Sequence, residues 1–490
     1  METIHLKTVD PISQEILLAA ARREIPLLWE RFEKMQPQDG FLRLGLSCPY
    51  GCLQGPCRID PFGRGADRGI CGLDRDGMAA ALFLRLVLCG CLESGNPFGI
   101  SGKPAPAQSP VWEKLISRAV KNFGGGNLSP AEPGECAQLL SRPMADPEEL
   151  IRRALRMGLL ALTFAEKNVK EDGGPRTSSI SAGYGLLSEK KWNIAIGGQP
   201  EDRHLKALAK LAGQEEVQIL SLGAWIPLDG SYLPIVCSSG EGELALASGR
   251  IHLLIAGPGT DPALIELCRS LGISCLFPAD GKEQKKALQR LRREGERLGS
   301  GSFTPDSALI EKAQVIKDAG DLAQAIRKKS PKHLCFLGGA DTPQQSLGWI
   351  PGEAAASLIG KDCLVGAWGD AALWILKKKL CSTAYESSVK ILNPEKGPIL
   401  ALQACAATNR IKDLKICYTG LKTCKDLAFA LGAAALGAQV CAAVPLPLWG
   451  SEKDRKLLME GLATQGAEFQ HFDHPPEAQE ILDWFSRNGK

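Results

Sequence analysis

The chain has 490 residues, long enough for more than one domain, and its 58 basic and 55 acidic residues leave a formal net charge of only +3. This balance argues against a nucleic-acid partner and against attachment to a membrane surface by a basic tail. The 17 cysteines are not spaced like a secreted disulfide framework, and the N-terminus shows no signal-peptide pattern, so we expect a cytoplasmic protein with free thiols.

The first part of the chain, residues 1–185, is predicted to be a largely helical domain. Asp10 and Pro11 are typical of a helix start, because Asp caps the first turn and proline fits the first helical position. Apolar residues continue at helical spacing through this first segment. The same spacing predicts further helices at 76–92, 112–123 and 147–167.

Beyond this point short apolar runs alternate with amphipathic segments, a pattern that favours parallel βαβ units. Strands are expected at 192–196, 217–222, 251–256, 333–337, 362–367, 398–404 and 439–444. A polar, glycine-bearing stretch at 294–306 divides them into two domains, 186–300 and 301–490. The fold class is therefore α/β, with a helical N-terminal domain followed by two parallel-sheet domains.

The longest apolar stretch, 427–449, is too interrupted to be a membrane span. Gln439, Pro445 and Pro447 break it, so it indicates a buried helix followed by a buried strand.

Four cysteines in one short stretch are the strongest functional signal. Cys48, Cys52 and Cys57 lie close together, and Cys71 follows a loop rich in glycine and proline. Iron–sulfur cubanes are held by four cysteine thiolates, and a turn-rich backbone can curl such thiolates inward. Zinc is the alternative, although its sites usually pair two knuckles across a longer gap, and four merely buried thiols would not gather in such a loop. We therefore predict one [4Fe–4S] cluster on these four cysteines.

A second candidate site is predicted near the C-terminus. Cys405 follows the strand expected at 398–404, and Thr423 is a candidate N-cap for the next helix. A thiol in the first turn of a helix has a lowered pKa, and the adjacent Lys425 acts in the same direction on Cys424. We therefore take Cys424 and Lys425 as candidate catalytic residues and Cys405 as a candidate metal ligand. The alternative is a surface lysine beside inert buried thiols.

The run Gly55-Pro-Cys57-Arg-Ile-Asp-Pro61-Phe-Gly63, followed by Gly69-Ile-Cys71-Gly72, resembles the nickel–iron carbon monoxide dehydrogenases, relatives of the hybrid-cluster proteins. Looser matches, such as Gln403-Ala-Cys405 and Thr423-Cys424-Lys425, extend the resemblance over most of the chain. The resemblance implies a cluster-bearing helical domain followed by two Rossmann-like domains. It also implies that the four clustered cysteines hold the family's relay cubane.

The sequence departs from this family where the family holds its other metals. Asp39 and Ser47 stand at the positions of two cysteines that supply a cubane shared between subunits, so a homodimer of this chain would lack the shared cluster. Only Cys405 and Lys425 match residues of the family's active site. The segments aligned with the other ligands of that site contain no His or Cys; they are 196–200, 222–225, 256–258, 338–340 and 368–370. A nickel–iron sulfide cluster needs several thiolates and an imidazole, so we do not expect nickel.

Three functions remain open. The first, which we favour, is an iron–sulfur redox protein that carries one [4Fe–4S] cluster and transfers electrons to a ferredoxin-like partner or a complex subunit. The second is a working anaerobic nickel-dependent carbon monoxide dehydrogenase, which converts CO and water to CO2 and passes electrons to a ferredoxin-like acceptor. The third is a non-catalytic scaffold subunit of a redox complex. The chain is an oxidoreductase enzyme only in the second case.

Overall fold

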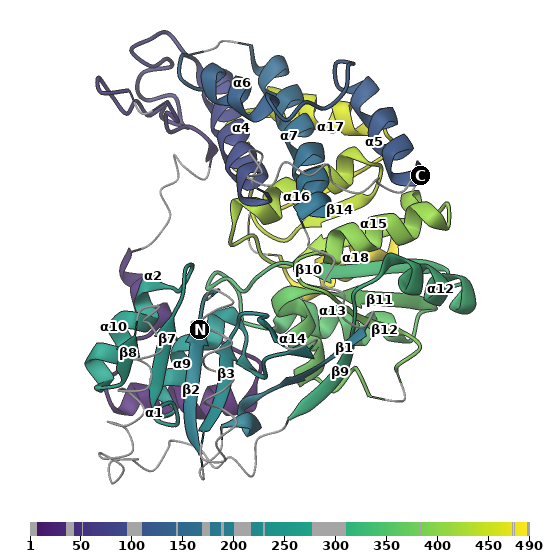
Figure 1. Ribbon diagram of the computed structural model, residues 1–490. Helices are drawn as coiled ribbons and strands as arrows, with labels where there is room; N and C mark the ends of the chain where they lie inside the picture. Colours follow the sequence, from purple (N-terminus) through teal and green to yellow (C-terminus); the bar gives the residue numbers. More distant parts are fainter. Residues whose placement is uncertain are drawn as a thin grey trace.

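A computed structural model describes most of the chain. The described residues are 7–35, 44–50, 52–95, 110–143, 146–168, 177–187, 191–199, 217–228, 231–276, 310–382, 385–472, 474 and 476–487. Figure 1 shows a helical region with α4 to α7 above, and a sheet that crosses the lower part of the molecule. Asp39 and the boundary predicted at 294–306 lie outside the described residues.

Thirteen strands form one continuous sheet, in the order β15-β14-β13-β10-β11-β12-β9-β1-β6-β3-β2-β7-β8. Their bounds are β1 (Thr177–Ala182), β2 (Trp192–Gly197), β3 (Val217–Leu222), β6 (Ile235–Cys237), β7 (Leu253–Ala256), β8 (Ser274–Leu276), β9 (Glu311–Ile316), β10 (His333–Gly338), β11 (Cys363–Ala367), β12 (Val389–Leu392), β13 (Leu414–Tyr418), β14 (Gln439–Ala442) and β15 (Phe469–His471). A separate short hairpin consists of β4 (Pro227–Leu228) and β5 (Ser231–Tyr232).

The pairing of β1 with β9 divides this sheet into two parallel halves. These two strands run antiparallel, with Thr177 opposite Ile316 and Ala182 opposite Glu311. The other neighbouring strands in the described sheet pair in parallel. The strands of the first half therefore run opposite to those of the second. The two predicted parallel sheets are joined edge to edge, and β1, from the segment predicted to be helical, belongs to this sheet.

The helices are α1 (Pro11–Arg22), α2 (Leu28–Met35), α4 (Arg75–Glu93), α5 (Pro110–Asn122), α6 (Glu132–Leu139), α7 (Pro147–Asn168), α9 (Gly242–Ala247), α10 (Pro262–Leu271), α12 (Ala319–Lys329), α13 (Trp349–Ile359), α14 (Gly369–Lys377), α15 (Gly397–Ala407), α16 (Cys424–Ala435), α17 (Glu452–Ala463) and α18 (Ala478–Ser486). The predicted helices near 76–92, 112–123 and 147–167 are confirmed as α4, α5 and α7. Asp10 caps α1 as predicted, accepting a hydrogen bond from the Ser13 N–H. No helix in the described part of the chain is long and apolar enough to cross a bilayer.

The strand predicted at 398–404 is wrong, because these residues lie within α15. This helix is buried on most of its surface, so its sequence is apolar all round and lacks the polar face that marks a surface helix. An apolar run of this kind cannot be assigned to strand or helix by periodicity alone. The other six predicted strands are present as β2, β3, β7, β10, β11 and β14.

The helical region shares its core with the second half of the sheet. Helices α4, α7 and α16 pack against one another, although α16 comes from the C-terminal part of the chain (Figure 1). Gly158 of α7 and Gly432 of α16 meet at their backbones, since a Cβ atom on Gly158 would lie 2.7 Å from the Gly432 nitrogen. A larger side chain at either position would force the two helices apart.

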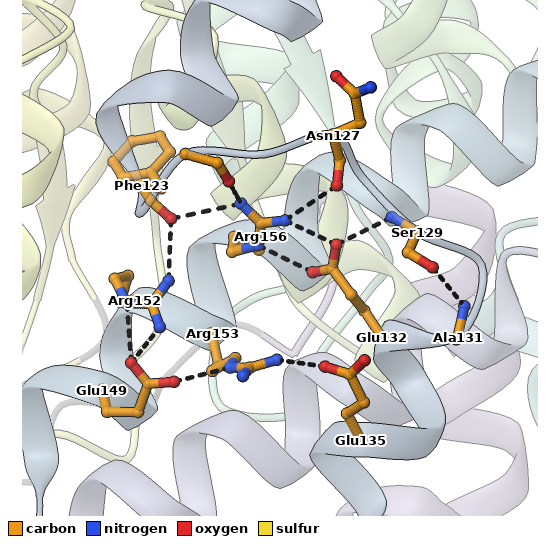
Figure 2. Close-up of polar contacts among 11 residues, drawn as sticks. Phe123, Asn127, Ser129, Ala131, Glu132, Glu135, Glu149, Arg152, Arg153 and Arg156 are labelled. Atoms are coloured by element: carbon orange, nitrogen blue, oxygen red, sulfur yellow. Dashed lines mark hydrogen bonds and ion pairs between the residues drawn. The ribbon is translucent and has the colours of Figure 1, made fainter.

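A buried ion pair fixes α6 and α7 to the turn that joins α5 to α6 (Figure 2). Arg156 and Glu132 are 6% and 4% exposed, and the guanidinium donates from Nε to Oε2 at 2.8 Å and from Nη2 to Oε1 at 2.7 Å. Arg156 Nη1 also donates to the Gly125 carbonyl at 2.9 Å. Such bidentate pairs combine charge with fixed geometry, so Arg156 orders the glycine turn as well as the helices.

A second buried cation, Lys377 of α14, joins the two halves of the molecule. Its Nζ lies 2.5 Å from Glu241 Oε2 and 3.8 Å from Asp10 Oδ2. Burial lowers the pKa of Lys377, but the two carboxylates outweigh this effect and raise the pKa above its usual value. Ser13 of α1 completes the group by donating to Glu241 Oε1 at 2.5 Å.

Candidate functional site

The predicted cluster loop is held at both ends by backbone hydrogen bonds. Cys48 N–H donates to the Cys57 carbonyl at 2.9 Å, and Ile59 N–H donates to the Leu46 carbonyl at 3.1 Å. Ser47 and Arg58 form an antiparallel bridge between these two contacts. The loop from Cys48 to Cys57 therefore starts and ends at the same place, as a compact ligand loop requires.

The segment with the fourth cysteine lies beside Cys57. The Ile70 N–H donates to Cys57 Sγ at 3.4 Å, and a Cβ atom on Gly69 would lie 3.5 Å from the same sulfur. The Gly72 N–H donates to the Gly69 carbonyl at 2.9 Å, which makes a tight turn around Cys71. The chain thus returns from the long loop directly to the first three cysteines.

All four cysteines are free thiols, and two of them pack on a small hydrophobic cluster. Cys48 and Cys57 are half-buried, whereas Cys52 and Cys71 are exposed. The cluster underneath consists of Leu46, Ile59, Leu73 and Met78, and both half-buried cysteines pack against it. In the described part of the chain no three Cys, His, Asp or Glu side chains stand close enough together to hold a metal ion. The four-cysteine centre therefore remains a prediction.

Cys405 does not have the position that was predicted for it in the second candidate site. It lies in the last turn of α15 and not at the end of a strand, and it is fully buried. Burial raises the pKa of its thiol to about 12, which disfavours the thiolate that a metal needs. Cys405 is a small apolar residue in the core, and its expected convergence with Cys424 at a strand end is wrong.

The predicted cap of α16 is confirmed. The pKa of Cys424, however, is raised, whereas a lowered pKa was predicted. Thr423 Oγ1 accepts the Asp426 N–H at 3.3 Å. Burial raises the pKa of Cys424, and the neighbouring Cys89 thiol and Glu93 carboxylate raise it further. The carboxylate Oε2 of Glu93 accepts the Lys425 N–H at 3.1 Å, so α4 supplies an acidic group to the positive end of α16.

Three of the five segments that align with the family's ligand segments lie close together at the junction of the two halves, where the chain carries carboxylates; they are 222–225, 338–340 and 368–370. Asp370, just after β11, accepts hydrogen bonds from the Ser239 N–H at 2.9 Å, the Ser239 hydroxyl at 2.5 Å and the Asp341 N–H at 2.9 Å. Asp341, just after β10, accepts the Trp374 indole N–H at 2.8 Å. Sequence reasoning missed this pair, because Asp341 lies one residue outside an aligned segment and no spacing links it to Asp370.

The indole of Trp368, two residues before Asp370, is packed in the core. The side chain is buried, and a Cβ atom on Gly338 would lie 2.2 Å from its ring. A Cβ atom on Gly397 would lie 2.5 Å from the same ring, and the Tyr418 ring packs edge-on with its centroid 6.0 Å away. Glycines 338 and 397 therefore make room for an aromatic side chain inside one of the aligned segments.

The carboxyl pair should make stability depend on pH. Burial and the adjacent Asp370 raise the pKa of Asp341 to about 8, so the folded chain keeps a proton that the unfolded chain releases near pH 4. Stability from this proton is complete below pH 4 and is lost as the pH rises to about 8, by at most about 1.4 kcal/mol per pH unit. Asp341→Asn should flatten this slope in urea unfolding between pH 5 and 8.5. The exposed control Glu148→Gln should not change it, and an unaltered slope in Asp341→Asn would contradict the assignment.

Comparison with known proteins was made against families, curated sequences and solved structures. No family model matches the chain. Carbon monoxide dehydrogenase 1 of Methanosarcina mazei is 45% identical over 89 residues, which are 18% of this chain and 14% of that protein. Carbon monoxide dehydrogenase of Rhodospirillum rubrum is 47% identical over 81 residues, 16% of this chain and 12% of that protein. The sequence matches therefore span only a small part of these relatives.

The solved structures match along nearly the whole chain. Carbon monoxide dehydrogenase IV from Carboxydothermus hydrogenoformans has a TM-score of 0.72 at 19% identity, with 98% of each chain covered. A nickel-free carbon monoxide dehydrogenase from Thermococcus sp. AM4 has a TM-score of 0.76 at 19% identity, with 98% of this chain and 96% of that chain covered. Nearly the whole chain therefore has the fold of these carbon monoxide dehydrogenases, and one segment of fewer than 90 residues is also similar to them in sequence.

Proposed function

We propose that the chain is an iron–sulfur redox protein of this family, with one [4Fe–4S] cluster on Cys48, Cys52, Cys57 and Cys71. The observation that supports this best is the Ile70 N–H, which donates to Cys57 Sγ at 3.4 Å. Backbone N–H groups favour the ionised sulfur that a cluster needs, and they tune its potential. When bound, such a cluster supplies electron transfer.

The chain's own residues would set the environment of that cluster. Leu46, Ile59 and Leu73 form a dry surface behind Cys48 and Cys57. Leu53, Phe62 and Ile70 are exposed apolar side chains of the same loop region. We propose that a redox partner contacts this exposed side, because electron transfer is favoured when little protein separates donor from acceptor. A homodimer of this chain would form without a shared cluster, since Ser47 stands at one of the required positions.

We further propose that the chain lacks the nickel–iron centre. Asp341 and Asp370 place hard carboxylate ligands at the junction of the two halves, whereas nickel and iron in a sulfide cluster need soft thiolates. Trp368, in one of the aligned segments, fills the space beside Gly338 and Gly397, and Cys405 is buried in α15. The chain's residues therefore do not fit that group.

Anaerobically purified, nickel-reconstituted protein should not oxidise CO at a rate above background, because the segments aligned with the family's other metal ligands contain neither Cys nor His. The measurement is CO-dependent reduction of a viologen dye, with an active carbon monoxide dehydrogenase reconstituted in parallel. Rapid dye reduction together with bound nickel would overturn this prediction and support the working enzyme.

Potentiometry separates an electron carrier from a scaffold. A relay cluster should cycle reversibly between two oxidation states at a potential that a ferredoxin-like partner can reach. A cluster that binds iron but cannot be reduced or oxidised without loss of iron would support the scaffold function instead.

A further inference from the structure

Cys89 of α4 lies beside Cys424 of α16, because the two helices cross there with their backbones in contact. A Cβ atom on Gly90 would lie only 1.9 Å from the Cys424 carbonyl oxygen and 2.8 Å from the Lys425 nitrogen. Only glycine permits so close an approach. The residue before Gly90 is Cys89, so the two cysteines occur at the same crossing point.

Residues one turn apart on α4 face this crossing. Cys89 and Glu93 are four residues apart, a spacing that places them on one face of a helix. The Glu93 carboxylate accepts the Lys425 N–H at 3.1 Å, so this face is directed toward the start of α16. Cys89 is exposed, and Cys424 is half-buried. Both thiols are therefore accessible from solvent, unlike Cys91 on the buried face of the same helix.

We propose that Cys89 and Cys424 form a redox-active dithiol that closes reversibly to an intramolecular disulfide. The oxidant is a low-molecular-weight disulfide. One thiolate attacks it and releases the first thiol, and the second cysteine then displaces the other thiol to form the Cys89–Cys424 bond. The two cysteines lose two electrons and two protons, and the small disulfide gains them as two free thiols.

The surroundings of Cys424 lack the feature that makes a disulfide strongly oxidising. Burial raises the pKa of Cys424, and the Cys89 and Glu93 side chains raise it further. A lowered thiol pKa stabilises the reduced form and gives a strongly oxidising disulfide. The raised pKa of Cys424 gives its reduced form no such stabilisation, so the disulfide is not strongly oxidising. The inference does not rest on the proposed cluster, because neither cysteine is among its predicted ligands.

The pair is tested in the intact protein, kept anaerobic and equilibrated in reduced and oxidised glutathione at increasing ratios. The protein is then rapidly alkylated and digested with trypsin without reductant. Trypsin cuts after Lys422 and after Lys425, and mass spectrometry should find the resulting Cys424 peptide linked to the peptide that contains Cys89. Alkylation of Cys89 and Cys424 should fall together as the linked species rises. The visible absorption reports in the same samples whether any cluster stays intact, so failure of the dithiol is distinguished from failure of the cluster.

Two variants show whether Cys89 or the nearby Cys91 is the disulfide partner of Cys424. Cys89→Ser should abolish the linked peptide, whereas the matched variant Cys91→Ser should leave it unchanged. The inference is overturned if both thiols are fully alkylated in folded protein under the most oxidising buffer. It is also overturned if the linked peptide persists in Cys89→Ser, since Cys91 would then be the partner.

Discussion

Cys57→Ser should remove the broad visible absorption of the purified protein and lower its iron content by about four atoms per chain, as expected for a cubane with four cysteine ligands. Cys57 is the critical position because its sulfur accepts the Ile70 N–H at 3.4 Å and lies beside the turn that carries Cys71. Without this thiolate, the cluster would lose the ligand that lies between the loop of Cys48 and Cys52 and the turn of Cys71. Iron and zinc are counted together on protein purified without oxygen, and zinc in place of iron in the unaltered protein would favour the zinc site.

The control for this experiment is Cys275→Ser, a half-buried cysteine in β8 that is not part of the loop. Its iron content and absorption should match those of the unaltered protein. Unchanged iron in Cys57→Ser would reject the proposed ligand set, and equal losses in both variants would show a general loss of folding.

Arg156→Met should lower the free energy of unfolding by about 3–5 kcal/mol, the usual cost of removing one partner of a buried ion pair. Glu132 would be left with a carboxylate that is 4% exposed and no cation beside it, and the Gly125 carbonyl would lose its donor (Figure 2). Urea unfolding followed by far-ultraviolet circular dichroism measures the change.

Arg153 provides a matched comparison on the same helix. It pairs with Glu149 at 2.8 Å and Glu135 at 2.8 Å, but its side chain is 22% exposed. Arg153→Met should therefore cost about 1 kcal/mol or less, as partly exposed pairs do. The double variant Arg156→Met with Glu132→Leu should recover much of the stability, because no buried charge remains unpaired. If Arg156→Met and Arg153→Met cost the same, the role given to the buried pair is wrong.

Local sequence signals predicted those elements whose chemistry is local. Asp10 and Thr423 cap α1 and α16 because a cap needs only its own next few residues. The apolar runs that became β10 and β11 were recognisable because short, flanked runs are typical of buried parallel strands. The strand predicted for the apolar run in α15 was wrong for the same reason, since a helix buried on all sides has an equally apolar sequence.

The site depended more on distant residues, which no local pattern reveals. The position of Cys424 in the first turn of α16 was foreseen, but Glu93 and Cys89 reach it from α4, more than 300 residues earlier in the chain, and they reverse the direction of its pKa shift. The junction carboxylates are similar, because Ser239, Asp341 and Asp370 come from three separate segments. In contrast, Cys48, Cys52, Cys57 and Cys71 are close in sequence, and this made them the clearest candidates.

The antiparallel pairing of β1 and β9 has a consequence for any attempt to divide the protein. If the chain were cut in the stretch between β8 and β9, each fragment would expose one long edge of the sheet with unsatisfied N–H and C=O groups. Such edges recruit other strands, so separately produced fragments should aggregate alone and recombine when mixed. The seam between β1 and β9 thus makes the two halves one unit of folding, although each resembles a familiar parallel domain.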